Sequence, residues 1–342
     1  MKSIKRTIDE HYIKIMVVGP GYGESILINI AGNILIGLDS CEEFLASTSP
    51  DKPRLLDQVL DDHDFKEKYW IFSHYHFDHY MGAGTLMTSE NRTKFDQIYT
   101  PQEYSSKDMA YLVSEHAFNK TKDLALKIRA RSEYVKLRQN TNDKYGSVTS
   151  INGTQEIVTR LFMDSKGIQN EVRVVLYSGS EQLKRKTIAN SLNSILNDRE
   201  LSRKVCNTCS QILRIQYGDK ECWFLADAPK SRYTYIDFNG EVDFLKISHH
   251  GSKTGTSEAS LNKFKSKEVN KIKSKAVITP YSPSKLPKNI VLDLIKEKGF
   301  DVCLTNAHPI LKDSLKNGIG GFLNVKVNSS INLEKSVNLF EI

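Results

Sequence analysis

Residues 73–79 read SHYHFDH and follow directly on the apolar stretch 69–72. Three imidazoles and one carboxylate therefore stand within six residues, as His74, His76, Asp78 and His79. Neutral imidazole and carboxylate are ligands that Zn²⁺ and similar divalent ions prefer. The chain has nine histidines in 342 residues, so chance alone rarely gathers three of them in a solvated polar loop. The stretch predicts a metal site at the end of a buried strand.

The same kind of strand end recurs later in the chain. Residues 248–254 read SHHGSKT and follow an expected strand at 242–247. Asp227 and Asp39 each end a further apolar stretch. A buried carboxylate needs a cation or a set of hydrogen-bond donors, whereas an aspartate before Ala-Pro, as at Asp227, also commonly starts a turn. In the company of the histidines Asp227 is a ligand candidate, and Asp39 has the same two interpretations.

Strand and helix patterns recur in two halves, about 10–165 and 171–342, with no Pro/Ser-rich linker between them. We therefore expect a single α/β domain spanning 1–342, with a basic helical insertion at about 105–145. Periodicity and turn residues place the expected strands at 11–18, 25–30, 33–38, 69–72, 172–177, 211–217, 221–226, 242–247, 276–279 and 320–327, and the expected helices at 51–68 and 289–298.

Composition indicates a soluble globular protein. Hydrophobic residues make up 39% and charged residues 26%, with a mean hydropathy of -0.42, which excludes the disordered, collagen-like and membrane classes. The N-terminus offers no apolar signal segment, and five scattered cysteines are an odd number, so a cytoplasmic protein with reduced thiols is expected. Cys206 and Cys209 have CxxC spacing but no second pair, which favours core residues over a zinc knuckle.

The positive charge is concentrated in two segments. The net charge is +7, and residues 105–145 carry nine basic against five acidic residues, while 253–275 carry seven lysines against two glutamates. Such segments are more often solvated faces than grooves, but the second begins beside the SHHGSKT stretch. An anionic substrate, such as a nucleic acid, is therefore favoured. Sparse aromatic residues do not indicate a stacking platform for single strands.

The chain resembles the metallo-β-lactamase fold of metallohydrolases. The resemblance rests on H-x-H-x-D-H at 74–79, an aspartate at a strand end at Asp227, and LKISHHGS at 245–252. Within that fold it is similar to the hydrolase domain of the competence protein ComEC and to bacterial phosphorylcholine esterases, through residues 17–28, 34–39 and an N-x-x-S element at Asn207 and Ser210. It runs from about residue 12 to 330. It implies an α/β fold, a four-layer αβ/βα sandwich of two mixed β-sheets flanked by helices.

The resemblance also implies a site with two divalent ions, zinc first and manganese as the alternative. His74 and His76 would bind one ion, Asp78 and His79 the other, and Asp227 would bridge them. One of His249 and His250 would complete the second ion, and the sequence does not say which. Taking His249 as the ligand leaves His250, with Lys253, to contact a phosphate or leaving group, although Lys253 fits a solvated helix-start turn equally well. Asp39, with Asn207 and Ser210, would support the ligands.

The chain departs from the resembled pattern in two places. Between His79 and His249 the only histidine is His116, where the broader fold supplies a further ligand. The first ion would then have fewer protein ligands, with Asn207, water or His116 in that place, and would bind more weakly. Leu286 stands where competence-type proteins tend to carry a histidine before the proline. A substrate contact would be missing there.

The expected activity is hydrolysis by a metal-bound hydroxide. Two bridged divalent ions lower the pKa of a shared water from 15.7 to about 7, and the same cations neutralise charge on phosphoryl oxygens. A phosphodiesterase or nuclease is therefore the leading hypothesis. Hydrolysis of another ester, a thioester or a lactam remains open, as does a non-catalytic binding protein that retains the metal site. No membrane partner is expected, and the oligomeric state is undetermined.

Overall fold

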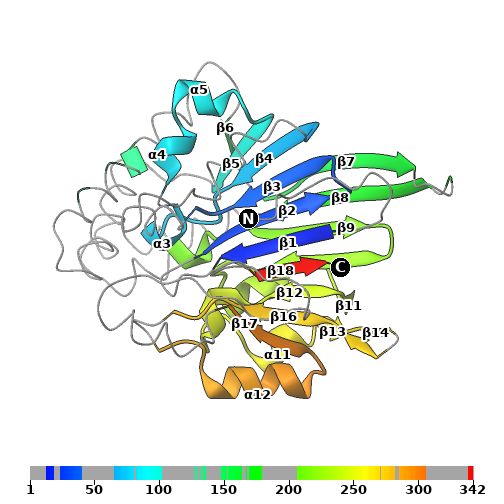
Figure 1. Ribbon diagram of the computed structural model, residues 1–342. Coiled ribbons are helices and arrows are strands. Elements are labelled where there is room, and N and C mark those ends of the chain that lie inside the picture. Colours follow the sequence, from blue (N-terminus) through cyan, green and yellow to red (C-terminus); the bar gives the residue numbers. More distant parts are fainter. Residues whose placement is uncertain are drawn as a thin grey trace.

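The structure is a computed structural model, and it describes residues 13–18, 24–40, 65–80, 82–101, 128, 132, 134–135, 148–151, 153–163, 167, 169–178, 206–269, 271–281, 285–305 and 338–341. Its described strands form two seven-stranded mixed sheets that lie face to face (Figure 1). Two smaller sheets of two strands each lie beside them.

The first sheet is formed mainly by the N-terminal part of the chain. Its strands β2 and β3 are buried at every position, as expected of strands covered on both faces. Ala31 and Gly32 connect them with φ of 51° and 65°, the left-handed values of a tight hairpin. The strand order is β18 (Asn338–Glu341), β1 (Ile13–Val18), β2 (Ser25–Ile30), β3 (Ile34–Leu38), β4 (Glu67–Ile71), β5 (Gln97–Pro101) and β6 (Val148–Ile151), antiparallel from β18 to β3 and parallel from β3 to β6.

The second sheet repeats this plan with the later strands. Its long edge hairpin is largely exposed, and a Gly218-Asp219 turn joins the next two strands. The strand order is β7 (Thr154–Met163), β8 (Gln169–Tyr177), β9 (Ile212–Tyr217), β10 (Lys220–Phe224), β12 (Phe244–Lys246), β16 (Lys275–Ile278) and β17 (Asp301–Leu304). Strands β7 to β10 are antiparallel and β10 to β17 are parallel.

The core between the two sheets is made of their inward-facing side chains. Ile28 and Ile36 of the first sheet belong to the same buried cluster as Val174, Ile215 and Phe224 of the second. Alternate residues of the second sheet, Trp223 and Leu245 among them, face the other way. The sheets are therefore held together by an apolar layer whose burial is the main stabilising contribution.

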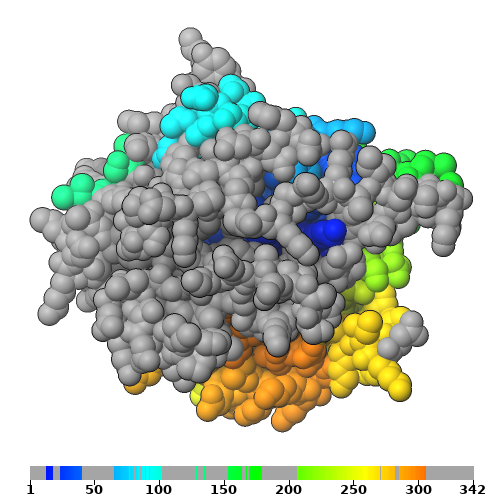
Figure 2. Space-filling model, in the orientation of Figure 1, coloured from blue at the N-terminus to red at the C-terminus, as the bar shows by residue number. Residues whose placement is uncertain are grey.

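Helices cover the outer face of the second sheet. There α12 (Asn289–Glu297) buries Val291 and Ile295 against it, and its C-terminal Gly299 has φ of 86°, which suits a helix end. In the space-filling view α12 forms the lower surface, in orange (Figure 2). The other short elements are α3 (Phe77–Tyr80), α4 (Ala83–Leu86), α5 (Ser89–Arg92), η1 (Lys230–Tyr235), η2 (Ser248–Gly251), α11 (Glu258–Leu261), β11 (Gly240–Val242), β13 (Phe264–Ser266), β14 (Glu268–Val269) and β15 (Ile272–Lys273).

The predicted α/β sandwich of two mixed sheets with flanking helices is confirmed. So are the hairpins expected at 25–38 and 211–226 and the helix at 289–298. The expected continuous strand at 242–247 is wrong. It breaks at Asp243, whose backbone and carboxylate both bind the backbone of Glu221, so β11 pairs with β13 and only β12 joins the second sheet.

The two sheets also do not coincide with the two expected halves of the chain, 10–165 and 171–342. Strand β7 lies before residue 165 yet belongs to the second sheet, and β18 returns to the first. Of the helix expected at 51–68, residues 51–64 lie outside the described residues, and Glu67 and Lys68 belong to β4 instead of a helix. The strand expected at 320–327 and most of the basic segment 105–145, including His116, lie outside the described residues. Among the described helices none is long and apolar enough to cross a membrane.

A close approach between β3 and β4 gives a test of the first sheet. Gly37 pairs with Trp70, and a Cβ at Gly37 would lie 2.1 Å from the indole ring. We expect Gly37→Ala to lower the free energy of unfolding by about 2 kcal/mol, because the buried ring must shift. Denaturant unfolding measures the loss. In a Trp70→Leu background the same change should cost less than half as much, and an equal cost there would contradict the proposed clash.

Candidate metal centre

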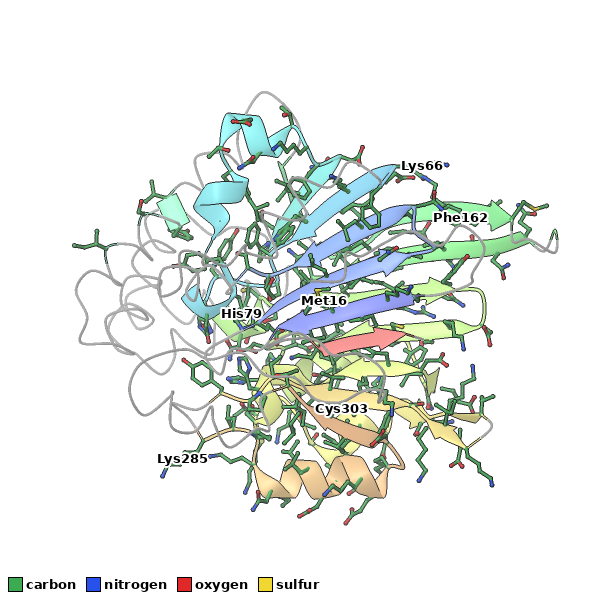
Figure 3. All side chains as sticks on the ribbon, viewed as in Figure 1. Met16, Lys66, His79, Phe162, Lys285 and Cys303 are labelled. Carbon is green, nitrogen blue, oxygen red and sulfur yellow. The ribbon has the colours of Figure 1, made fainter. Side chains whose placement is uncertain are left out.

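The predicted site residues come together where strands of both sheets end. Asp39 follows β3, the 74–79 stretch follows β4, Asp227 follows β10 and the pair at 249–250 follows β12. Figure 3 shows His79 at this end of the sheets. In open α/β sheets, ligands bind beyond the carboxyl ends of parallel strands. The cluster is buried, except that the His249 side chain is 27% exposed.

Asp227 stands at the centre of the cluster. Its Oδ2 lies 3.7 Å from Nε2 of both His74 and His249, and its Oδ1 lies 3.6 Å from Nε2 of both His79 and His250. These distances are too long for hydrogen bonds. Two atoms bound to one Zn²⁺ at about 2.0–2.1 Å in tetrahedral geometry would lie about 3.4 Å apart. The spacing therefore fits ions placed between the imidazoles and the carboxylate.

The inward-facing atoms have no hydrogen-bond partner among the described residues. Four atoms of the cluster are buried without such a partner: Nε2 of His74, His79 and His250, and Oδ1 of Asp227. Leaving so many polar atoms unsatisfied is costly unless something binds them. The residues thus fit a divalent ion by both ligand type and spacing.

Three groups of described side chains could each hold an ion, and Glu24, Asp39 and His79 form the one that does not include Asp227 or His250. The remaining two groups are His74, His79 and Asp227, and Asp78, His79 and His250, with ligand atoms within 4.8 Å of one another in each group. His76 is buried beside them, its ring 4.8 Å from that of His74. His250, rather than His249, is thus the histidine grouped with Asp78 and His79.

Asp39 fixes the loop that carries the first histidines. Its carboxylate accepts hydrogen bonds from the Ser73 backbone at 2.7 Å, from Ser73 Oγ at 2.6 Å and from His79 Nδ1 at 2.7 Å. Because Nδ1 of His79 is used in this way, its Nε2 is the atom turned toward Asp227. Ser73 Oγ also lies 3.0 Å from Nδ1 of His74. Asp39 was predicted to orient the loop, whereas the part of Ser73 was missed.

The adjacent histidines are oriented by different partners. Nδ1 of His250 lies 2.8 Å from the carbonyl oxygen of Thr279, so it donates there and Nε2 faces the cluster. Nδ1 of His249 lies 3.1 Å from Thr254 Oγ1, and Asn207 Nδ2 lies 3.4 Å from the same ring. Both histidines have left-handed φ, 49° and 53°, a strained conformation for residues with a Cβ. That turn directs both rings toward Asp227.

Burial and neighbouring charge set the protonation of the cluster. Burial raises the pKa of Asp227, but the four surrounding histidines outweigh it and hold that pKa well below its usual range. Burial lowers the pKa of His74 to about 3. Burial also lowers the pKa of His79, but Asp39 and Asp227 outweigh it and raise the pKa to about 10. In the absence of metal, Asp227 is therefore ionised, His74 is neutral and His79 is protonated near neutral pH.

A buried ion pair supports the His250 side of the site. Lys246 Nζ lies 2.5 Å from Glu24 Oε2, and both side chains are 1% exposed. Thr279 Oγ1 donates to the same carboxylate at 2.6 Å, and the Thr279 carbonyl holds His250. Burial raises the pKa of Glu24, but Lys246 and the histidines lower it overall. Sequence reasoning missed all three residues, since none carries a ligand pattern.

The remaining predicted residues lie around the cluster. Asn207 and Ser210 are buried in the turn before β9, and the Ser210 backbone N–H donates to the Asn207 carbonyl at 3.1 Å. Lys253 is exposed beyond η2, so the structure leaves it at the surface rather than in the buried cluster. Cys206 and Cys209 are buried and are not joined in a disulfide bond.

Comparison with known proteins adds a distant structural likeness. No family model matches the chain, and no curated protein does. Among solved structures, a CmlA beta-hydroxylase (E377D mutant) matches with a TM-score of 0.33 and 8% sequence identity, over 85% of this chain and 52% of that one. The chain thus spans about half the length of that protein. So distant a likeness assigns no activity.

The Glu24–Lys246 pair gives a test of the supporting network. We expect Lys246→Met to lower the free energy of unfolding by about 3–5 kcal/mol, because it leaves a buried carboxylate unpaired. Chemical denaturation measures the change. The double variant Glu24→Gln/Lys246→Met should regain most of the loss.

A surface pair serves as the control. Lys298 lies 3.5 Å from the exposed Glu258, and Lys298→Met should cost less than about 1 kcal/mol. Equal losses in the single and double variants at 24 and 246 would show that burial of an unpaired charge is not the cause.

Proposed function

We propose that this protein is a metal-dependent hydrolase with two divalent ions bridged by Asp227, and that its substrates are phosphodiesters. The observation that carries the proposal is the convergence of four buried or half-buried imidazoles on the two oxygens of one buried carboxylate, at 3.6–3.7 Å. No purely structural need explains so many inward-facing ring nitrogens. The resemblance to metallo-β-lactamase-type hydrolases favours the same conclusion.

The ligand sets follow from which oxygen each ring faces. His79, His250 and Asp78 would hold one ion with Oδ1 of Asp227. His74 and His76 would hold the other with Oδ2, and His249 faces that same oxygen. In this proposal His249 supplies the ligand that the middle of the chain lacks, and His250 takes the place first given to His249. Zinc is the metal that this donor set favours, with manganese as the alternative.

When bound, the ions would supply a water of lowered pKa and neutralise charge on phosphoryl oxygens. The chain's own residues orient the site for this chemistry. Asp39 and Thr279 fix the rings of His79 and His250 through their Nδ1 atoms. His249 is the partly exposed member, so the substrate approaches on its side, where Thr254 and Lys253 are exposed.

Protein nucleophiles are poorly placed for the reaction. Burial raises the pKa of the Cys206 thiol, which keeps it protonated and unreactive at neutral pH. Ser248 Oγ is buried and donates its hydrogen bond to the Ala228 carbonyl at 2.5 Å, so this hydroxyl is not available to attack a substrate. Hydrolysis through an activated water is therefore the mechanism that the residues favour. Basic residues at the exposed side favour phosphodiesters over neutral esters and lactams.

Metal content is the first test. We expect the purified protein to contain about one to two equivalents of zinc or manganese, measured by inductively coupled plasma mass spectrometry. His76→Ala and Asp227→Ala should lose most of it, because each removes a ligand. Asp237→Ala changes an exposed aspartate of the same segment and should retain the wild-type content. Full activity in metal-free wild-type protein would refute the proposal.

Substrate turnover is the second test. We expect hydrolysis of bis-p-nitrophenyl phosphate, and a rate at least about a hundredfold lower in Asp227→Ala, because the bridging ligand is lost. Nitrocefin and a thioester, assayed in parallel, test acyl chemistry. Faster turnover of either than of the phosphodiester would replace the proposed substrate class. No turnover of any of them, with metal bound, would favour a binding protein.

A further inference from the structure

We propose that Lys253, Lys285 and Lys288 form a second anion subsite beside the metal centre. It would bind a phosphate of a polyphosphodiester strand next to the one that is cleaved. This inference rests on the proposed function, because it names the substrate as a strand rather than a small diester.

The subsite is an open cavity of about 380 Å³, and the charged side chains among its described lining residues are the three lysines. Lys253 and Lys285 are exposed and form no ion pair with any residue that the structure describes. Figure 3 shows the Lys285 side chain extending from the lower left of the molecule, at the same end as His79. The remaining lining residues are Pro287, Asn289 and Ile290. With no carboxylate among its described lining residues, the cavity favours an anion.

The cavity is in contact with the loop that carries His250. The backbone N–H of Lys288 donates to the carbonyl of Gly251, the residue after His250, at 3.1 Å. Pro287 packs so closely that a Cβ at Gly251 would lie 2.5 Å from it. The ring of His250 also lies 5.1 Å from that of Tyr281, whose backbone pairs with Leu286. A strand lying on the exposed side of the metal site would therefore continue over the lysines.

The chemistry of the lining indicates what part of the strand is read. Lysine is a flexible point charge that neutralises a phosphate without fixing base identity. The lining residues that the structure describes include no aromatic side chain, so they offer no stacking surface for a base. The first turn of α12 carries no acidic residue that would repel the strand. The subsite would thus bind the backbone of a DNA or RNA strand irrespective of sequence.

The test measures binding of a strand to the protein as purified. The probe is a fluorescein-labelled single strand about twelve nucleotides long, with phosphorothioate linkages to slow cleavage, prepared as DNA and as RNA. Fluorescence anisotropy gives Kd at several salt concentrations. We expect Lys285→Gln/Lys288→Gln to raise Kd about fivefold and to reduce the slope of log Kd against log salt by about 0.7, the value for one phosphate contact on a single strand.

A matched variant controls for the loss of two charges. Lys265 and Lys271 are exposed and lie in β13 and the β14–β15 turn, at the opposite end of the second sheet (Figure 1). Lys265→Gln/Lys271→Gln should bind like the wild type. The subsite is refuted if the two double variants bind equally well, or if the wild type binds neither strand. A preference for DNA or RNA above about tenfold would also refute it, because backbone phosphates alone do not distinguish them.

The outcomes separate this inference from the proposed function. Weakened binding in the subsite variant, with no hydrolysis of bis-p-nitrophenyl phosphate or of an unmodified strand by the wild type, supports the subsite and refutes the phosphodiesterase. Hydrolysis by the wild type, with equal binding by both double variants, retains the phosphodiesterase and refutes the subsite.

Discussion

The burial of one negative charge, on Asp227, is the constraint on which the rest of the site depends. A carboxylate at the end of β10 is 2% exposed, and a charge so placed is tolerated only where opposite charge or strong donors surround it. Two of the four imidazoles around it follow β4 of the first sheet, and the other two follow β12 of the second sheet. The charge of Asp227 is therefore compensated only when the two sheets pack against each other and bring both pairs of histidines together.

The two sheets contribute in parallel ways. Each has antiparallel strands on one side and parallel strands on the other, and the parallel strands end at the site. Each also supplies an anchor for a histidine Nδ1, Asp39 after β3 in the first sheet and Thr279 after β16 in the second. The inward-facing ring nitrogens are thus oriented from both sides, while the His249 side of the cluster is partly exposed. The proposed hydrolase would need this combination of rigidly held ligands and one accessible face.

Much of the fold and the candidate ligands could be predicted because their signals are local. Turn residues between apolar stretches mark the hairpins, and clustered histidines after a strand mark the site. β7 was missed because its residues are mostly exposed and lack alternation, and β18 because it pairs with distant β1. Glu24 and Thr279 are ordinary residues whose parts depend on tertiary contacts. His249 and His250 face different oxygens of Asp227, and their rings are oriented by Thr254 and Thr279, which no spacing encodes.

The buried pair of Glu24 and Lys246 has a consequence for how this sequence can change. The glutamate precedes a strand of the first sheet and the lysine ends a strand of the second, with both side chains 1% exposed. Replacing either residue alone leaves an unpaired charge in the interior. Replacing both by neutral residues of similar volume lowers the stability of the fold far less. Related chains should therefore carry both or neither. Drift through a single intermediate would pass through a poorly folded protein, so the two positions are expected to covary.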